Sequence, residues 1–457
     1  MNILFVSLGC DKNLVDSEIM LGLIRDKGYQ ITNEEKEADI IVVNTCCFIN
    51  DAKEESINTI LEMAEYKRTG TLKVLIVTGC LGQRYKEEIQ KEISEVDAIL
   101  GTSSYNEIVT VIEDALEGRK TVSVKEPEDI KAVKTSRINT TGGYFSYLKI
   151  AEGCDKHCTY CIIPKIRGNY RSVPMESLIK EAKDLVSSGI KELILVAQET
   201  TLYGKDIYGE KKLPELLKEL CKIDGLEWIR ILYSYPEEIT DELIQVIKSE
   251  DKICKYLDMP IQHASDSILK RMGRRTNKEE LTNIIRKLKE NIPEIALRTT
   301  LISGFPGETE EEHEELKEFL KEMKFDRLGV FTYSKEDDTP AAKMKNQIHK
   351  HIKKRRQAEI MELQQEIAFD HAMDTVGRKL KVMIEGKLPE DSLEEQSILE
   401  PEQLLSMGNI YIGRTYMDAP NVDGFIFVQA RGELMSGEFV EVMVTDAKEY
   451  DLIGELI

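Results

Sequence analysis

The sequence predicts an α/β protein of three consecutive regions, and three patterns support this. In residues 1–118, apolar runs of strand length alternate with helical stretches, which is typical of a parallel α/β sheet. In residues 143–372, six strand-and-helix units follow one another and predict a partial (βα)6 barrel with a final linker helix. In residues 373–457, short alternating strands with glycine turns predict a small antiparallel β-barrel of the OB-like kind.

The first region is expected to contain three strands that each end at a cysteine. The runs are NILFVSLGC, DIIVVNTCC and VLIVTGC, and helical patterns such as SEIMLGLIRDKG separate them. The carboxyl ends of parallel strands share one edge of a sheet, where ligands bind. We therefore expect the thiols of Cys10, Cys46 and Cys80 to lie close together. The polar stretch 125–141 predicts a linker.

The second region supplies six candidate strands, and the first leads into a cysteine motif. The strands are YFSYLKIAEG, ELILVAQET, WIRILYSYP, YLDMPIQH, ALRTTLISGF and RLGVFTYS. A barrel of such units carries its active site at the carboxyl ends of the strands. Cys154, Cys158 and Cys161, in the spacing CxxxCxxC, follow the first of these ends. A long helix is expected over 341–375.

Composition and charge limit the class of function. We see no signal peptide and no run of about 18 apolar residues, so we expect a cytoplasmic protein without a membrane partner. Nine cysteines in a reducing compartment favour metal binding or chemistry over disulfides. The net charge of −21 makes a nucleic-acid partner such as transfer RNA less suitable, because such a partner usually requires a basic surface.

The CxxxCxxC motif offers three thiolates, and the missing fourth ligand is informative. Structural zinc takes four ligands, and the only nearby candidate, His157, is poorly placed in the same tight loop. A redox disulfide motif consists of CxxC alone and does not account for the first cysteine of the motif. Three thiolates fit a 4Fe–4S cluster with one open iron, whose place a substrate or cofactor takes.

The three N-terminal cysteines support a second cluster of the same kind. Each alone could be a small buried hydrophobic residue, which is common for a free cysteine. Three at equivalent strand ends instead predict another three-thiolate cluster. Cys46 is preferred over Cys47 because side chains alternate along an extended backbone. Cys221 and Cys254 are expected to be structural.

The CxxxCxxC motif with Tyr160 before its last cysteine, at the first strand of a partial barrel, resembles the radical S-adenosylmethionine (SAM) enzymes. The resemblance implies that SAM binds the open iron and that an external one-electron reductant, of the flavodoxin or ferredoxin type, drives its cleavage to a hydrogen-abstracting radical. His313, in EEHEELKEFL, is expected to be an exposed helix residue. Cofactor-binding candidates at or near the strand ends are Tyr160, Gln198, Glu199, Gln262, Arg298 and Gly304, and His263 is the candidate for substrate binding.

Nearly the whole chain resembles the methylthiotransferase family, whose domain order is an N-terminal three-cysteine domain, a radical SAM core and a C-terminal TRAM barrel. The resemblance implies two 4Fe–4S clusters and two SAM molecules, with the sulfur to be inserted held at the second cluster. The two clusters should face each other across the substrate, because a carbon radical needs its trap within near-contact distance.

Two substrate classes occur in this family, an adenosine of transfer RNA and an aspartate of a small-subunit ribosomal protein. LGCDKNLVDSE (8–18), YLDMPIQHAS (256–265) and YIGRTYMDAPNVDG (411–424) resemble the second branch, although Asn421 departs from its usual Glu. We therefore expect methylthio insertion at the β-carbon of an aspartate. A transfer-RNA enzyme and a non-catalytic iron–sulfur scaffold remain as alternatives.

The charge of the C-terminal region also bears on the partner. From Met373 to the end there are 17 Asp or Glu and 7 Lys or Arg, a net charge of −10. A barrel that holds transfer RNA should be basic, because each phosphate contact needs a cation. An acidic barrel attracts a basic protein, so we expect it to dock the ribosomal protein. The acidity could instead serve solubility alone.

Overall fold

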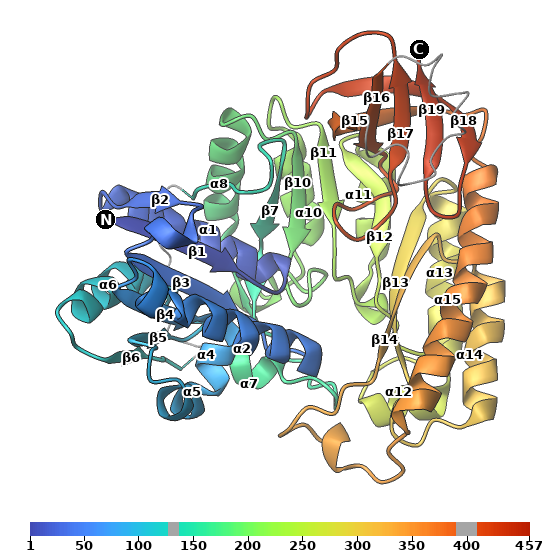
Figure 1. Ribbon diagram of the computed structural model, residues 1–457. Helices are drawn as coiled ribbons and strands as arrows, with labels where there is room; N and C mark the ends of the chain where they lie inside the picture. Colours follow the sequence, from blue (N-terminus) through green and yellow to red (C-terminus); the bar gives the residue numbers. More distant parts are fainter. Residues whose placement is uncertain (127–136, 390–408) are drawn as a thin grey trace.

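The computed structural model describes residues 1–126, 137–389 and 409–457. These residues form two six-stranded sheets and a closed five-stranded barrel, which confirms the predicted fold class (Figure 1). Most of the predicted linker 125–141 and the segment 390–408 lie outside the described residues. Within the described part of the chain, no helix is long and apolar enough to cross a membrane.

The N-terminal sheet is parallel throughout, with strand order β2-β1-β3-β4-β5-β6. The three predicted strands are the central ones, while β2, β5 and β6 have three residues each, too few to give a recognisable sequence pattern. Because β6 pairs with β5, this sheet extends past the predicted boundary at residue 118. The strands are β1 (Asn2–Ser7), β2 (Gln30–Thr32), β3 (Ile40–Thr45), β4 (Val74–Thr78), β5 (Ala98–Leu100) and β6 (Thr121–Ser123); the helices are α1 (Asp11–Asp26), α2 (Asn50–Ala64), α3 (Tyr66–Thr69), α4 (Gly79–Arg84), α5 (Lys86–Glu92) and α6 (Ile108–Leu116).

The second sheet is the predicted partial barrel, with its six parallel strands in the order β7-β10-β11-β12-β13-β14. Side chains alternate along each strand: Leu193 and Leu195 pack against the outer helices, while Ile194 and Val196 point inward. The strands are β7 (Phe145–Lys149), β10 (Glu192–Val196), β11 (Trp228–Ile231), β12 (Ile253–Asp258), β13 (Ala296–Ser303) and β14 (Arg327–Thr332); β8 (Ala151–Glu152) and β9 (Arg171–Ser172) form a separate ribbon. The helices are α7 (Ile163–Arg167), α8 (Met175–Ser187), α9 (Lys205–Tyr208), α10 (Leu213–Cys221), α11 (Asp241–Ser249), α12 (Asp266–Met272), α13 (Lys278–Asn291), α14 (Glu310–Met323) and α15 (Lys350–Met373).

The long helix begins later than the sequence predicts. Residues 341–349 form a short 3-10 turn and a loop, and α15 starts only at Lys350. The Ala341 N–H donates to the Thr159 carbonyl at 2.9 Å, and Asn346 has φ of 60°, a left-handed conformation that interrupts a helix. The segment therefore serves to cover the cysteine loop of the barrel.

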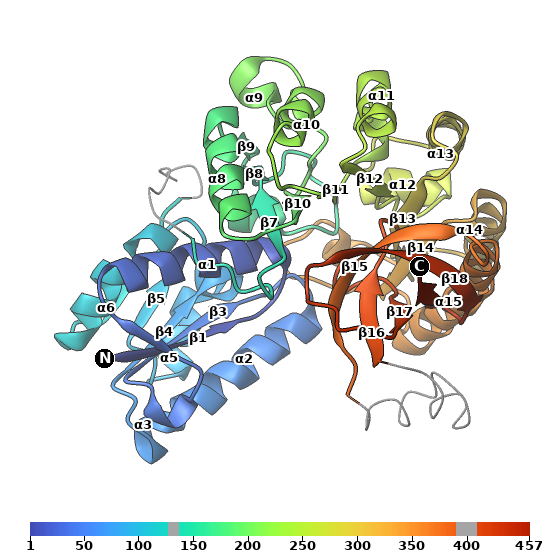
Figure 2. The same cartoon turned by 90° about the horizontal axis from the view of Figure 1, so that it is seen from above.

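The C-terminal barrel closes in the order β15-β16-β17-β19-β18. It is antiparallel except for one parallel pair, β17 with β19. It packs against the amino ends of the parallel barrel strands, where Trp228 stacks edge-on against Phe439 at a centroid distance of 4.8 Å (Figures 1 and 2). The strands are β15 (Lys379–Lys387), β16 (Asn409–Arg414), β17 (Ile426–Ala430), β18 (Phe439–Ala447) and β19 (Leu452–Leu456).

Buried ion pairs fix this C-terminal barrel in place. Glu192, fully buried at the start of β10, accepts from Arg230 at 2.8 Å and from Arg414 at 2.7 Å. In the loop after β16, Asp418 pairs with Arg327 and Asp423 with Arg298. The motif YIGRTYMDAPNVDG (411–424) therefore supplies the three C-terminal partners of these ion pairs, Arg414, Asp418 and Asp423.

Candidate functional site

Cys10, Cys46 and Cys80 lie at the carboxyl edge of three neighbouring strands, β1, β3 and β4. A Cβ added to Gly9 would lie 2.8 Å from the Cys46 Cβ, so the first two strand ends are in direct contact. Gly9 has φ of 91°, which a residue with a side chain rarely adopts. Burial raises the pKa of the Cys80 thiol; Arg167 acts in the opposite direction, and the thiols of Cys47, Cys46 and Cys10 raise this pKa further.

The structure distinguishes Cys46 from Cys47. Cys47 is fully buried in the hydrophobic core of the N-terminal domain, and burial raises its pKa to about 12. Cys46 is held at the edge, because the Ser56 hydroxyl donates to its carbonyl at 2.9 Å and accepts from its N–H at 3.0 Å. The choice of Cys46 as the ligand stays a prediction. Of the other two cysteines, Cys254 is buried and Cys221 packs against the barrel core.

Cys154, Cys158 and Cys161 lie in a tight loop after β8. A Cβ on Gly153, whose φ is 80°, would lie 2.0 Å from the Asn169 carbonyl, so this position requires glycine. The Cys161 N–H donates to the Cys158 carbonyl at 3.0 Å, which draws the last two cysteines together. The Cys158 sulfur lies 3.8 Å from the Tyr235 hydroxyl, beyond the carboxyl end of β11.

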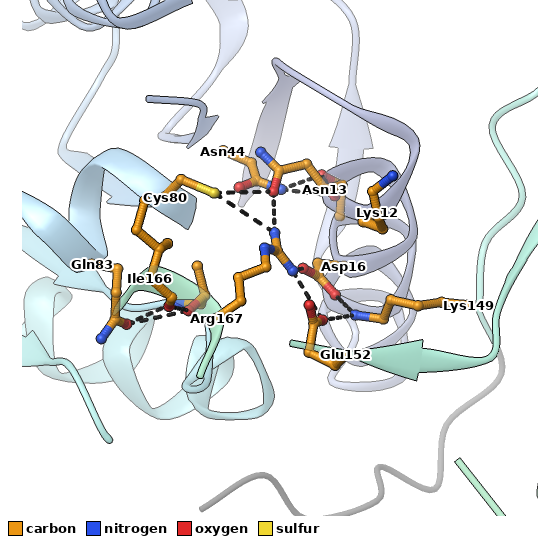
Figure 3. A network of polar contacts seen from close by, with 12 residues as sticks. Lys12, Asn13, Asp16, Asn44, Cys80, Gln83, Lys149, Glu152, Ile166 and Arg167 are labelled. Atoms are coloured by element: carbon orange, nitrogen blue, oxygen red, sulfur yellow. Dashed lines mark hydrogen bonds and ion pairs between the residues drawn. The ribbon is translucent and has the colours of Figure 1, made fainter. Parts of the chain in front are cut away.

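A buried network centred on Arg167 runs from Cys80 into the parallel barrel that carries the second cysteine set (Figure 3). Arg167 ends α7, the helix that begins just after Cys161, and this helix packs against α4, which carries Cys80. Its guanidinium donates to Glu152 at 2.9 Å and to Asp16 at 3.0 Å. It also donates to the Asn13 side-chain carbonyl and lies 3.9 Å from the Cys80 sulfur.

The network continues from Glu152 to the next strand of the barrel. Glu152 accepts from the Gln198 amide at 2.9 Å and from Lys149 at 2.7 Å. Burial alone would raise the pKa of Glu152, but the cationic Arg167 and Lys149 outweigh burial and hold this pKa below its ordinary value. A continuous chain of polar contacts thus runs from Cys80 to a candidate cofactor residue. The sequence reasoning missed Arg167 and Asn13, since an isolated Arg or Asn gives no spacing signal.

Glu199 is a candidate cofactor residue in a strongly perturbed environment. It is fully buried, and burial raises its pKa to about 7. The Thr201 hydroxyl donates to one of its carboxylate oxygens, but Oε2 has no hydrogen-bond partner and lies 3.7 Å from Lys156. An unpartnered buried carboxylate oxygen suits a cationic group such as the ammonium of SAM.

Tyr160 also lies in this region. It contacts Phe305 edge-on at a centroid distance of 6.4 Å, and burial and its neighbour Cys158 raise its pKa. Buried polar atoms without a partner gather near the same strand ends, as expected where a polar cofactor supplies the missing contacts. They include Gln198 Oε1, Glu199 Oε2, Ser234 Oγ, Glu237 Oε2 and Arg274 Nε.

Arg298 and Gly304 have contacts that differ from those expected, and for Gln262 the cofactor role stays a prediction. Arg298 pairs with Asp258 at 2.9 Å and with Asp423 of the C-terminal barrel at 3.2 Å, which occupies its guanidinium. At Gly304 an added Cβ would lie 2.4 Å from Lys353, so the close approach is to α15 rather than to a ligand. Gln262 pairs through its backbone with β13, and its φ is 69°.

His263 is not brought to either cysteine set. Its Nδ1 accepts from the Ser265 N–H at 2.9 Å, and burial lowers its pKa to about 3. The charged groups around it, Glu312 foremost, belong to the outer helices. The expectation that His313 is exposed was wrong: it is fully buried, and its Nε2 lies 2.8 Å from Glu359. Its partner Glu359 belongs to α15. This helix covers the face of α14 that the sequence pattern predicts to be exposed to solvent.

The two cysteine sets fit iron–sulfur clusters better than single metal ions. Two sulfurs on one zinc ion can be no more than about 4.6 Å apart, twice a Zn–S bond. Among the described residues, the only three metal-binding groups with all ligand atoms within 4.8 Å are His313, Glu314 and Glu359. Neither cysteine set is such a group, and a cube with one thiolate per iron needs sulfurs spaced more widely than a single ion does.

Comparison with known proteins places the chain in a family. Residues 2–101 match Uncharacterized protein family UPF0004, residues 148–320 the Radical SAM superfamily, and residues 376–457 the TRAM domain. The ribosomal protein uS12 methylthiotransferase RimO of Lachnoclostridium phytofermentans is 70% identical over 454 residues, 99% of each chain. The chain belongs to the RimO family. The RimO protein of Clostridioides difficile is 50% identical over 451 residues, 99% of this chain and 98% of that one.

Membership of the RimO family and of the radical SAM superfamily makes this chain a radical SAM transferase, with an iron–sulfur cluster and SAM as cofactors. Solved structures agree on the fold. TsrM, a radical SAM methyltransferase from Kitasatospora setae, has a TM-score of 0.55 at 14% identity and covers 82% of this chain and 78% of its own. OxsB, a cobalamin-dependent SAM radical enzyme, has a TM-score of 0.51 at 14% identity, and the match covers 75% of this chain and 54% of OxsB.

Proposed function

We propose that this chain inserts a methylthio group at the β-carbon of an aspartate in ribosomal protein uS12. The observation that carries the proposal is the presence of two three-cysteine sets, with the buried Arg167 network running from Cys80 of one set into the barrel that carries the other (Figure 3). A scaffold or electron carrier has no need for two sites of three ligands each. RimO relatives at 70% and 50% identity favour uS12 over transfer RNA.

Six cysteines are proposed to hold two 4Fe–4S clusters: Cys10, Cys46 and Cys80 the second cluster, and Cys154, Cys158 and Cys161 the radical cluster. When bound, these clusters and SAM supply the one-electron chemistry and the sulfur that no side chain can provide. The chain's own residues place these groups. Tyr160, Gln198 and Glu199 are proposed to bind SAM, since Gln198 and Glu199 each have a buried oxygen without a hydrogen-bond partner and Tyr160 directly precedes Cys161.

Two partners are proposed. A flavodoxin- or ferredoxin-type protein supplies electrons, and the acidic C-terminal region docks the basic uS12. Six of the 17 acids of that region fall in 390–408, outside the described residues. Of those described, Glu433, Glu438 and Glu441 are exposed, whereas Asp418 and Asp423 are buried in ion pairs and unavailable to a partner.

The direct test uses protein reconstituted with iron and sulfide without oxygen. It is incubated with SAM, a reductant and either uS12 or transfer RNA, and mass spectrometry measures the added mass on each. We expect a methylthio shift on one aspartate of uS12 and none on transfer RNA. Modification of transfer RNA alone would refute the proposal. Replacing Cys154, Cys158 and Cys161 by Ala should abolish SAM cleavage, while replacing Cys10, Cys46 and Cys80 should abolish methylthio transfer alone.

A further inference from the structure

Another buried cation, Lys12, lies close to Cys10 in the chain and takes no part in the Arg167 network. It is in the first turn of α1, two residues after Cys10, and its side chain is 7% exposed. Figure 3 shows its side chain directed away from Arg167. The ammonium lies 3.2 Å from the centroid of the Tyr233 ring and 2.9 Å from Asp11 Oδ1, and no other carboxylate of the described chain lies within 4 Å of it.

Tyr233 places this cation at the active end of the parallel barrel. It follows β11, its N–H donates to Asp258 at 3.0 Å, and its hydroxyl donates to Asp11 Oδ1 at 3.1 Å. Its φ is 59°, a conformation that a tyrosine keeps only where the surroundings impose it, as they often do at binding sites. Two residues further on, Tyr235 contacts the Cys158 sulfur. Lys12 thus contacts the loop after β11, and Tyr235 of the same loop contacts a cysteine of the radical set.

The Asp11–Lys12 pair has unused hydrogen-bonding capacity. An ammonium has three donors, and Asp11 and the ring face occupy two directions, which leaves room for one more acceptor. Asp11 Oδ2 is buried and has no hydrogen-bond partner. The first turn of α1 has no side-chain cap, so its free N–H groups add positive potential at the same place. The site thus offers a cation and, beside it, an acceptor.

We propose that Lys12 binds the side-chain carboxylate of the aspartate to be modified, and that Asp11 Oδ2 accepts a main-chain N–H of the substrate. The inference rests on the proposed function and deepens it by naming a residue that selects the substrate. The β-carbon is bonded to the carboxylate carbon, so a held carboxylate fixes the reacting carbon. Asparagine and adenine carry no negative charge and gain less from an ammonium in a poorly solvated site.

The test compares uS12 with a uS12 variant in which the modified aspartate, located by mass spectrometry, is replaced by Asn. Dissociation constants for both are measured on the full chain holding its clusters, for wild type, Lys12→Met, Lys12→Arg and Lys27→Met. Lys27 is the matched control, an exposed lysine at the other end of α1 that pairs with Glu113. We expect wild type, Lys12→Arg and Lys27→Met to prefer the aspartate form by roughly 10- to 100-fold, and Lys12→Met to lose the preference.

The preference is the ratio of the two dissociation constants measured for one variant, so a loss of affinity that affects both forms of uS12 equally does not change it. A Lys12→Met protein that keeps the wild-type ratio would overturn the inference. If Lys12→Met fails to fold because Asp11 is left unpaired, Asp11→Asn combined with Lys12→Met removes the pair as a unit and is read in the same way. Wild-type protein that modifies transfer RNA and does not bind uS12 would instead overturn the proposed function itself.

Discussion

Replacing Arg167 by Met tests whether the buried network holds the N-terminal domain against the radical SAM barrel. The Arg167 side chain is 2% exposed and has two carboxylate partners, Glu152 and Asp16, at 2.9 and 3.0 Å. Removing one member of a buried ion pair typically costs about 3–5 kcal/mol, because the remaining charge stays buried. Lys149 still lies 2.7 Å from Glu152 and compensates in part. We therefore expect the lower end, about 3 kcal/mol, in the opening free energy of this interface.

Hydrogen exchange of the α1 and α7 amides, measured by mass spectrometry, gives that opening free energy directly. Arg119→Met is the matched control, since Arg119 also pairs with two carboxylates, Asp114 and Glu117, but is 56% exposed. A solvated pair of this kind contributes little, so we expect no measurable change. If Arg167→Met changes the opening free energy by less than about 1 kcal/mol, well below the usual cost of breaking a buried pair, the reasoning is refuted.

Three further outcomes are expected. Because the pKa of Glu199 is about 7, it gains its charge between pH 6 and 8, so SAM affinity measured by calorimetry should rise over that range in wild type and stay flat in Glu199→Gln. Cys47→Ala should keep about eight irons after reconstitution and Cys46→Ala about four, by one thiolate per iron with one iron open; the reverse pattern would show that Cys47 is the ligand. The pKa of Glu152 is lowered in the folded state, so its contribution to stability is present above its unfolded pKa and is lost as pH falls through the folded value; acid titration of unfolding should show less of this loss in Arg167→Met.

The fold and both cysteine sets could be predicted because they depend on patterns that are local in sequence. Parallel strands appear as apolar runs, and a cysteine at the end of each run identifies one sheet edge. Contacts between domains have no such pattern. Arg167 stands in an ordinary IPKIRG stretch, and its partners Asp16 and Asn13 lie about 150 residues earlier.

The roles expected for Arg298 and Gly304 differed from the contacts observed for the same reason. The sequence showed that Arg298 and Gly304 lie on a strand or at its end. It did not show the groups that pack against these two residues, because Asp423 comes from a later domain and Lys353 from a later helix. His313 was misjudged because its neighbours in EEHEELKEFL are acidic, although α15 covers it. Each difference thus arises from a contact between elements distant in the chain.

The location of the C-terminal barrel sets a condition on substrate delivery. Its anchors, Glu192, Trp228 and Arg327, begin their strands, whereas both cysteine sets lie at carboxyl ends. A strand of five or six residues is roughly 17–20 Å long, so a protein held only on the C-terminal barrel is not yet at the reacting atoms. Docking there can raise the local concentration of uS12 and align it, but selecting one aspartate requires a group at the cysteine end. Lys12 is a buried cation at that end with only one carboxylate partner among the described residues. This division of roles predicts salt-sensitive docking on the C-terminal barrel together with a local, charge-specific choice of residue.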